Sequence, residues 1–406
     1  MRVVIRLFLL LSFGAAPTVG SAKTDFWTRL GLSGERVTAM AVSPASPGTI
    51  YAGTLSGGLF QIVDREQKKL VDHLGSGSNA VTAIAVDPQN SAVLIAATAD
   101  GVFRTSDTGM HWSAVDATIV GCVALTIDAQ DPKIIYAGSS SAGVYKSIDG
   151  GTGWIRTALT GSVQAVAIDP RNHSNVYAGT SSGIARSTDG GSSWIGDAWT
   201  NGTVGALAIN PLEPNILYAG SLSAGVFKSS NAGTSWSESG LKGIPVHGLV
   251  VDIQEPDTVY AATDQGPFKS VDAGRMWYRI GEGLTSIRAP VMSGDLPICR
   301  VYVGTDDGAF ATDIGPVLTL HSNLCVGTAW TVVISHAPGN APARLLGTSN
   351  GISWEIPNWG TTNGAGMLTT TGTFPASAAG THNLRVEVGG VPSNLLSFTV
   401  LNCRTD

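Results

Sequence analysis

The chain is poor in charge, and it has no long apolar run after its first 22 residues. Asp, Glu, Lys and Arg make up 13% of its 406 residues, and the formal net charge is −6. Basic residues are scattered along the chain, which argues against a nucleic acid or an anionic membrane surface as a partner. A membrane-spanning helix needs roughly 20 apolar residues, and no later segment approaches that length.

The composition favours turns over helices. There are 51 glycines, and serine and threonine are plentiful. A chain of this kind is expected to form many turns and few helices, so we predict an all-β fold. Its length is too great for one small domain, and two domains are the natural expectation.

The N-terminus predicts export. MRVVIRLFLLLSFGAAPTVGSA places Arg2 and Arg6 before an apolar run, with small residues Gly20 and Ala22 at a cleavage position, so residues 1–22 are interpreted as a secretory signal. Without the two arginines the formal charge is −6 − 2 = −8. The mature protein is expected to be secreted or periplasmic, without a membrane span.

Cysteine is scarce, with four in the whole chain. Disulfides persist in exported proteins, and Cys325 and Cys403, which bracket the last segment, are predicted to pair. Cys122 and Cys299 lie in apolar, strand-like surroundings and are interpreted as small core residues. Neither has a His or Asp neighbour at metal-ligand spacing, and no dinucleotide or phosphate-loop motif is present, so no metal and no cofactor is expected.

One segment is repeated along most of the chain. TIYAGT recurs as VLIAAT, IIYAGS, NVYAGT, ILYAGS, TVYAAT and RVYVGT, and its second apolar position falls at Tyr51, Ile95, Tyr136, Tyr177, Tyr218, Tyr260 and Tyr302. The intervals are 44, 41, 41, 41, 42 and 42 residues. Each unit contains four short strands separated by turn residues, which is typical of a propeller blade.

Five units contain a turn with the pattern SxDxGxxW, with single departures at Thr105 and Asn231. Its residues are Asp107 and Trp112; Ser147, Asp149 and Trp154; Ser187, Asp189 and Trp194; Ser229, Asn231 and Trp236; and Ser270, Asp272 and Trp277. The short polar side chains can bond the backbone of their own turn, and the tryptophan packs beneath it. The pattern resembles the Asp-box of bacterial neuraminidase repeats, which implies a structural turn at the blade periphery, away from any catalytic pocket.

The two ends of the repeat region are incomplete. The first unit lacks the SxDxGxxW turn, and the seventh ends near Ala311 and Thr312 without an outer strand. DFWTRLGL, from Asp25 to Leu32, is similar to the Trp-led runs WIRTAL and WYRIGEGL. We therefore predict a seven-bladed β-propeller over residues 23–314, closed by this N-terminal strand.

The last segment, residues 315–406, has a different pattern. Alternating runs such as TVVISH and NLRVEV are separated by turn residues, which predicts an immunoglobulin-like β-sandwich. VGGVPSNLLSFTV resembles the closing strands of bacterial immunoglobulin-like modules. Trp354 and Trp359 lie in a polar, turn-rich stretch, where they either present a platform for a sugar ring or fill the sandwich core.

Motifs for catalysis are absent from the sequence. A glycosidase needs two paired carboxylates, and the acidic residues outside the turns show no pairing that sequence can certify. The repeats are similar to those of sialidases and of xyloglucanases. However, the Arg-Ile-Pro motif of sialidases is replaced by Arg279-Ile280-Gly281, and xyloglucanases face two propellers across one cleft where this chain has one.

The blade pattern VxAxAVDP, YAG and Asp-box also resembles photosystem II assembly factors and sortilin-like receptors, which bind polypeptides. Propellers usually bind at a mouth of the central channel, where the innermost strands begin. Positions there vary from unit to unit, and the candidate ligand-binding residues are Arg36, Thr38, Asn79, Thr82, Gln164, His247 and Arg288, with Val123 and Gly205 at the corresponding positions of two units. These residues either set specificity or plug a wet channel.

Two functions remain open from sequence. The first is an exported, non-catalytic scaffold that binds an extracellular or periplasmic protein or glycan at the channel mouth. The second is a polysaccharide-active glycoside hydrolase or lyase built on the same repeats. Two carboxylates converging in a deep pocket at the mouth would favour the second.

Overall fold

The computed structural model describes residues 27–313, apart from 57, 64, 73, 76–79, 117, 197–201, 254, 282, 288 and 294–299, and strand backbones between 317 and 400. Of residues 47, 289–293, 300 and 312 onward only the backbone is described. All regular elements in these ranges are β-strands, as expected from the composition. Among the described residues, no helix has the length and apolar character needed to cross a membrane.

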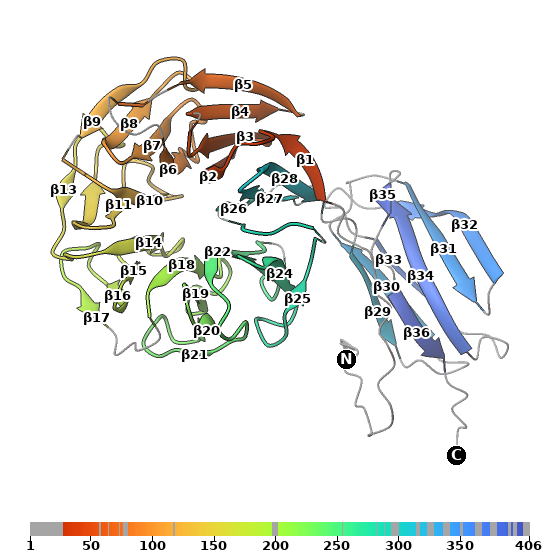
Figure 1. Cartoon of the computed structure of the whole chain (residues 1–406). Helices are drawn as coiled ribbons and strands as arrows, with labels where there is room; N and C mark the ends of the chain where they lie inside the picture. The colour runs from red at the N-terminus through yellow and green to blue at the C-terminus, as the bar shows by residue number, and fades with distance from the viewer. Residues whose placement is uncertain are drawn as a thin grey trace. The chain divides into compact units, whose positions relative to one another are not determined.

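Seven four-stranded antiparallel sheets are arranged as blades around a ring (Figure 1). Blades 1 to 3 consist of β2 (Val37–Ser43), β3 (Ser46–Thr54), β4 (Leu59–Val63), β5 (Glu66–Val71); β6 (Val81–Val86), β7 (Leu94–Thr98), β8 (Gly101–Thr105), β9 (Ser113–Asp116); and β10 (Cys122–Ile127), β11 (Ile135–Ser139), β12 (Gly143–Ser147), β13 (Ile155–Arg156). In each of these blades the first strand in the sequence lies nearest the ring centre, and the second, third and fourth follow toward the rim.

Blades 4 to 6 repeat this order. They consist of β14 (Val163–Ile168), β15 (Val176–Thr180), β16 (Gly183–Ser187), β17 (Ile195–Gly196); β18 (Val204–Ile209), β19 (Leu217–Ser221), β20 (Gly225–Ser229), β21 (Ser237–Glu238); and β22 (Val246–Val251), β23 (Val259–Thr263), β24 (Gly266–Ser270), β25 (Tyr278–Arg279). Blade 7 contains β26 (Ala289–Ser293), β27 (Arg300–Thr305) and β28 (Gly308–Asp313), with β1 (Trp27–Gly31) as its outer strand.

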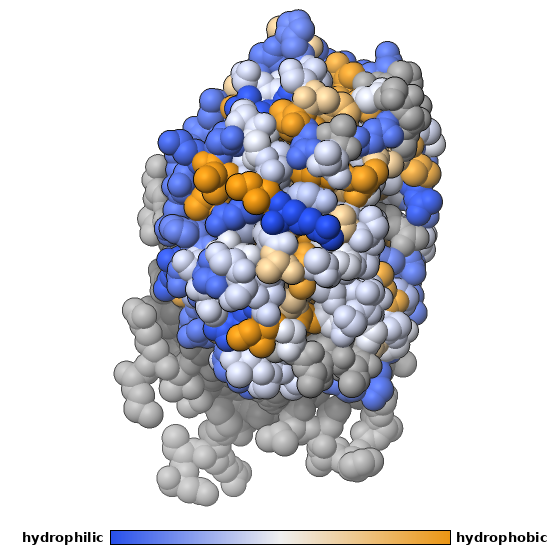
Figure 2. All heavy atoms as spheres, turned by 90° about the vertical axis from the view of Figure 1, so that its left-hand side faces the viewer, coloured by the Kyte–Doolittle hydropathy of each residue, from blue (hydrophilic) through white to orange (hydrophobic). Residues whose placement is uncertain are grey.

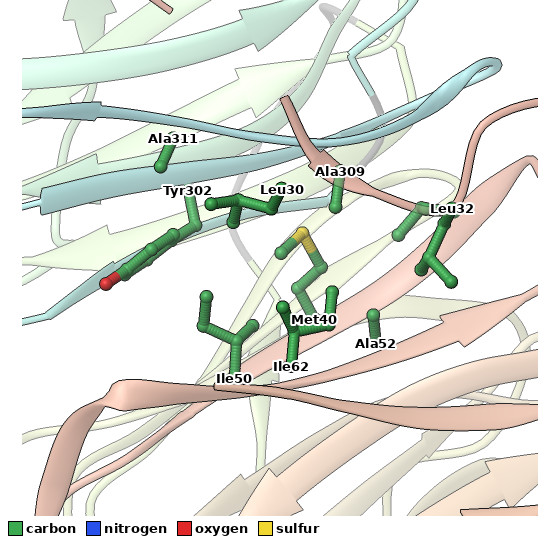
Figure 3. Packing of buried hydrophobic residues seen from close by; sticks show 10 residues of the cluster. Leu30, Leu32, Met40, Ile50, Ala52, Ile62, Tyr302, Ala309 and Ala311 are labelled. Carbon is green, nitrogen blue, oxygen red and sulfur yellow. The ribbon is translucent and has the colours of Figure 1, made fainter. Parts of the chain in front are cut away.

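The N-terminal strand closes the ring, as predicted from its similarity to the Trp-led runs. β1 pairs antiparallel with β28, so that Trp27 lies opposite Thr312 and Arg29 opposite Phe310. Leu30 and Leu32 are buried in a cluster that spans blade 7 and blade 1 (Figure 3). The cluster comprises Leu30, Leu32, Val37, Met40, Ile50, Ala52, Ile62, Tyr302, Ala309 and Ala311. The first strand of the chain therefore completes its last blade.

The second strand of each blade forms the densest part of the core. LIAAT of β7 and IYAGS of β11 are buried at every position, because both sheet faces are covered by neighbouring blades. Small residues in these strands allow the blades to approach closely. A Cβ atom added at Gly179 would lie 2.7 Å from the carbonyl oxygen of Val204 in blade 5, so this position requires glycine.

Cationic side chains of the third strands tie blades 2, 3 and 5 to the blade that follows each of them. Lys146 Nζ and Tyr136 Oη both donate to the carbonyl oxygen of Gly190 in blade 4, over 2.8 and 2.9 Å. Arg104 Nε makes the same kind of bond to Gly150 O in blade 3, at 2.9 Å, and Lys228 Nζ reaches Ala273 O in blade 6, at 3.1 Å. The accepting carbonyls belong to the SxDxGxxW turns, so these turns join neighbouring blades as well as strands.

The remaining strands belong to a second compact unit. β29 (Val317–Ser322), β30 (Ala329–Ser335) and β33 (Leu368–Thr373) form one sheet; β31 (Pro342–Ser349), β32 (Ile352–Thr361), β34 (Gly380–Val388), β35 (Val391–Pro392) and β36 (Leu396–Val400) form another. All described pairings are antiparallel. The immunoglobulin-like assignment of this unit stays a prediction.

Candidate ligand-binding face

One face of the ring gathers the turns that lie nearest to the starts of the innermost strands, and we call it the mouth face. In blade 4 the first residue of the innermost strand, Val163, pairs with Thr180 at the end of the second strand. The following hairpin turn therefore lies beside the strand start, and the same register is found in blades 1 to 3, 5 and 6. The hairpin turns of the mouth face are residues 55–58, 99–100, 140–142, 181–182, 222–224, 264–265 and 306–307.

Three ion pairs of the mouth face lie on blades 6, 7 and 1, and we call their side chains the charged arc. Its members are Arg29, Arg36, His247, Asp264, Asp306 and Asp307. Arg36 Nε lies 2.9 Å from Asp306 Oδ1, and His247 Nε2 lies 3.0 Å from Asp264 Oδ1. The acidic partners come from hairpin turns, and the basic partners from the segments that start the innermost strands.

The remaining ion pair of the charged arc belongs to the ring closure. Arg29 Nη2 contacts Asp307 Oδ2 at 2.6 Å, and the backbone N–H of Gly34 donates to Asp307 Oδ1 at 2.8 Å. The Arg29 guanidinium, together with the Gly34 amide, holds the pKa of the Asp307 carboxyl below its ordinary value of 3.8. A general acid requires the opposite shift, so Asp307 is poorly suited to that role.

Blades 3 to 5 present hydroxyl groups instead, and we call this set the hydroxyl arc. It consists of the hairpin residues Ser140, Ser141, Ser181, Ser182 and Ser223, of which all but Ser140 are exposed. Near them Gln164 Nε2 donates to Ser162 Oγ over 3.0 Å. Leu222 fills the space above Gly205, where an added Cβ would lie 2.5 Å from Leu222 Cδ2. This half of the mouth face is neutral and carries small side chains.

Two of the predicted ligand-binding hydroxyls are already engaged within the protein. Thr38 Oγ1 donates to the carbonyl oxygens of Gly53 and of Val81, at 3.2 and 2.6 Å. Thr82 Oγ1 does the same to Ala97 and Cys122, at 3.1 and 2.5 Å. Val81 and Cys122 begin the innermost strands of the next blades, so both threonines link blades. Only their oxygen lone pairs remain for a ligand.

Several sequence predictions fall outside the described residues. Asn79 and Arg288 of the predicted ring are among them, as are Cys299, Cys325 and Cys403. Trp354 and Trp359 both lie in β32, but their side chains are not described. The described cysteine, Cys122, is buried and unpaired, as its apolar surroundings indicated, and burial raises the pKa of its thiol to about 12.

The SxDxGxxW turns lie on the other face of the ring, because the third strand of each blade starts at the mouth face and ends opposite to it. In blade 3 Ser147 Oγ donates to Asp149 Oδ1 at 2.8 Å and accepts the N–H of Gly151 at 2.9 Å. Asp149 Oδ1 also accepts the N–H groups of Thr152 and Gly153. These bonds lower the pKa of the Asp149 carboxyl to about 2, the Gly153 amide contributing most.

The other turns repeat this geometry. Asp189 in blade 4 has its pKa lowered to about 2, chiefly by hydrogen bonds from the Ser193 hydroxyl and amide. Asn231 in blade 5 accepts the hydroxyl of Ser229 and the N–H of Ser235, both at 2.9 Å, so an amide oxygen fills the same position. The carboxylates of these turns accept hydrogen bonds from backbone and hydroxyl groups of the same turn.

No described group offers a metal site or an extended apolar surface. Among the described residues, no three His, Cys, Asp or Glu side chains are placed to hold a metal ion. Exposed large apolar residues such as Ile148, Ile155 and Ile195 belong to the turns and outer strands of blades 3 and 4. On the side of the molecule shown in Figure 2, hydrophobic residues form small groups separated by polar ones. Such scattered residues are ordinary for a protein surface.

Sequence reasoning missed the blade-to-blade cations and the ion pairs of the mouth face. The cations were visible as a basic residue in the runs GVFRT, GVYKS, GIARS, GVFKS and GPFKS, which precede each SxDxGxxW turn. The His247–Asp264 pair could have been found from hairpin register, because Val246 pairs with Thr263. The Arg36–Asp306 pair depends on closure of the ring and had no local signal.

Comparisons with known proteins agree with this fold. No family model matches the chain, and no curated protein matches it significantly. Among solved structures it is similar to a GH74 xyloglucanase from Xanthomonas campestris, with a TM-score of 0.59 and 18% identity over 77% of this chain and 59% of the xyloglucanase. It is also similar to YCF48 from Cyanidioschyzon merolae, with a TM-score of 0.54 and 17% identity over 71% of this chain and 98% of YCF48.

A structure of YCF48 bound to D1 peptide gives a TM-score of 0.56 and 13% identity, over 72% of this chain and 96% of that one. At these identities the likeness concerns the fold alone. The chain spans 59% of the length of the xyloglucanase, whereas YCF48 is covered almost completely. The same propeller fold is therefore found in a glycoside hydrolase and in a protein that holds a peptide.

Proposed function

We propose that the chain is an exported, non-catalytic propeller scaffold that binds a polypeptide at its mouth face. The observation that carries this proposal is the state of the charged arc, where the carboxylates of Asp264, Asp306 and Asp307 each lie against a basic side chain. A carboxylate held in this way is engaged within the protein, whereas glycoside hydrolysis needs two carboxylates that act on the substrate. The paired arc and the adjoining hydroxyl arc offer hydrogen-bonding groups suited to a polypeptide backbone.

A polypeptide is favoured over a glycan by the placement of aromatic side chains. Sugar rings are commonly held on exposed aromatic faces. The tryptophans with described side chains are Trp27, Trp112, Trp154, Trp194, Trp236 and Trp277, and they belong to β1 or to the SxDxGxxW turns. None of these lies in a hairpin turn of the mouth face. YCF48, which shares the fold, provides a precedent for a peptide ligand.

The remaining parts of the chain are assigned roles consistent with this function. Residues 1–22 act as the cleaved secretory signal, and the SxDxGxxW turns are Asp-boxes of the bacterial neuraminidase repeat. Residues 315–406 form an immunoglobulin-like module, which is stabilised by a disulfide between Cys325 and Cys403. In that module Trp354 and Trp359 provide either core packing or a second contact surface.

The test is selection of binding peptides on the mature chain, residues 23–406, from a random peptide library. Selected peptides are then measured against Arg36→Ala in the charged arc and Ser182→Trp in the hydroxyl arc. Thr188→Trp is the matched control, because Thr188 is exposed but belongs to a turn of the opposite face. We expect at least a tenfold weaker affinity for both mouth-face variants and no change for the control. Equal binding to all three variants would overturn the proposal.

A second function is favoured by one observation, the likeness to a GH74 xyloglucanase. In this case the mature chain would release reducing ends from xyloglucan or a related polysaccharide. We expect no release from a broad polysaccharide panel. Release that is lost in Asp264→Asn or Asp306→Asn, with folding retained, would replace the scaffold function by the hydrolase function.

A further inference from the structure

Every histidine whose side chain is described lies against an aspartate. His111 Nδ1 is 2.6 Å from Asp107 Oδ2, His247 Nε2 is 3.0 Å from Asp264 Oδ1, and His173 Nδ1 is 3.7 Å from Asp128 Oδ2. The first two pairs lie within a single blade. His173 and Asp128 belong to blades 4 and 3, so only this contact crosses a blade boundary among the three.

The Asp128 carboxylate is buried and incompletely satisfied. Its side chain is 3% exposed. Oδ1 accepts the N–H groups of Gln130 and Asp131, at 2.7 and 3.2 Å, but Oδ2 is buried without a hydrogen-bond partner among the described residues. A buried carboxylate oxygen without a donor is costly. The nearest cationic candidate is the imidazole of His173, which is half-exposed and can exchange protons with solvent.

The corresponding turn in blade 4 shows what blade 3 lacks. Asp169 Oδ1 accepts two backbone N–H groups in the same way, while Asp169 Oδ2 accepts Asn175 Nδ2 at 3.0 Å. Asn175 is six residues after Asp169, and the residue six after Asp128 is Ile134, which has no donor in its side chain. The two turns also share one backbone bond, Asp169 N to Asn175 O and Asp128 N to Ile134 O.

We infer that His173 and Asp128 form a pH-responsive contact between blades 3 and 4, which tightens when the imidazole is protonated. At 3.7 Å the two atoms are too far apart for a hydrogen bond with a neutral ring. An imidazolium would be drawn to the carboxylate and would supply the donor that Asp128 Oδ2 lacks. Protonation supplies both the charge and the additional ring N–H that the contact uses, so the contact tightens as the pH falls.

Other charged groups belong to the two turns that form this contact. Asp131 and Lys133 belong to the turn of Asp128, and Asp169 and Arg171 to the turn of His173. Tyr136 on β11 interacts with the charges of Asp128 and Asp189, and burial raises its pKa to about 12. Gln130 Nε2 donates to Pro170 O at 2.9 Å across the same boundary, and this neutral bond persists at any pH.

The sign of the effect follows from the charge of the pair. Because only the protonated ring attracts the carboxylate, the contribution of this contact to stability is present at low pH and is lost as the pH rises. An exported protein meets the pH of its surroundings directly. The inference concerns the scaffold itself, so it holds whatever ligand occupies the mouth face.

The test is a double-mutant cycle with His173→Gln and Asp128→Asn in the whole mature chain, measured by urea unfolding at pH 5.5 and pH 8.0. Asp128→Asn should fold, because Asn210 in blade 5 accepts the N–H groups of Leu212 and Glu213 in the corresponding turn. At pH 5.5 we expect the coupling between the two sites to change the unfolding equilibrium constant about threefold to tenfold. At pH 8.0 the coupling should vanish.

Two further variants make the result specific. His111→Gln is the control, because His111 pairs only within its own turn, and it should leave the cycle unchanged. Ile134→Asn copies Asn175 and should remove the pH dependence of the contact by giving Asp128 Oδ2 a permanent donor. A coupling of equal size at both pH values, or none at pH 5.5, would overturn the inference.

Discussion

The hydroxyl of Thr38 in blade 1 donates to the carbonyl oxygen of Val81, the first residue of the innermost strand of blade 2, over 2.6 Å. The same relationship joins Thr82 to Cys122 one blade further on. Blade 3 has Val123 at the corresponding position, so a residue of nearly the same shape without a hydroxyl is accommodated there.

Thr38→Val is therefore expected to lower the free energy of unfolding by about 1 kcal/mol, since it removes one partly buried hydroxyl, which is shared between the carbonyl oxygens of Val81 and Gly53, with little change of side-chain volume. Urea unfolding at pH 7 measures the difference. Thr160→Val, at an exposed threonine of a connecting segment, is the control and should have no effect. Equal stability of Thr38→Val and the unmodified chain would show that the bond contributes nothing.

Acid stability depends on the carboxylates of the SxDxGxxW turns. The pKa of Asp149 and of Asp189 is about 2, against an ordinary value of 3.8. A lowered pKa stabilises the fold above about pH 4, and this contribution is lost as the pH falls toward 2. The double variant Asp149→Asn with Asp189→Asn should unfold with a flatter dependence of melting temperature on pH between 4 and 2.

The asparagine of blade 5 makes that double variant a fair test, because Asn231 already fills the same position. Its folding at pH 7 should be retained with a moderately lower melting temperature. An unchanged slope between pH 4 and pH 2 would mean that other groups govern acid unfolding.

Closure of the ring should depend more on apolar packing than on its ion pair. Leu30→Ala removes a buried side chain from the cluster between blades 7 and 1, and we expect a loss of about 2 to 4 kcal/mol. Arg29→Ala breaks a pair that is exposed to solvent, and we expect a loss below about 1 kcal/mol. Chemical denaturation of the two variants, side by side, decides the order, and the reverse order would contradict this account.

The carbonyl oxygen of Gly190 receives two donors, Tyr136 Oη and Lys146 Nζ. Tyr136→Phe or Lys146→Met leaves one donor in place, so each is expected to cost about 0.5 to 1.5 kcal/mol. The double variant leaves the carbonyl without a side-chain donor and should cost more than the sum of the single changes. A double-mutant cycle measures this excess, and strict additivity would show that the two donors act independently.

Local patterns predicted the elements within each blade but not the contacts between blades. The repeated YAG run, the turn residues and the Trp-led runs are short-range signals, and they located the blades and the closing strand β1. By contrast, Lys146 and Gly190 are 44 residues apart, and Arg36 and Asp306 are separated by most of the propeller. Which side chain faces the neighbouring blade depends on the twist of the strands and on the curvature of the ring. Neither of these can be read from a single sequence.

At the candidate site, too, the sequence predicted where residues lie within a blade but not the contacts of their side chains. Alignment of the innermost strands identified Thr38, Thr82, Gln164 and His247 as a variable set, but it could not show that the threonine hydroxyls are used between blades. The acidic residues outside the turns, Asp264 among them, showed no certain pairing in the sequence, although hairpin register places Asp264 beside His247. Asp128 had no signal of its own in the sequence, since the missing donor on its second oxygen becomes visible only when turns of different blades are compared.

The lengths of the outermost strands bear on how this protein behaves when it is concentrated. β13, β17, β21 and β25 contain two residues each, too few to recruit a neighbouring chain through backbone pairing. β5 is longer, with six residues, yet its sequence EQKKLV places Lys68 and Lys69 on the exposed border. Intermolecular sheet growth is thus discouraged at the four two-residue strands by lack of length, and at β5 by its lysines.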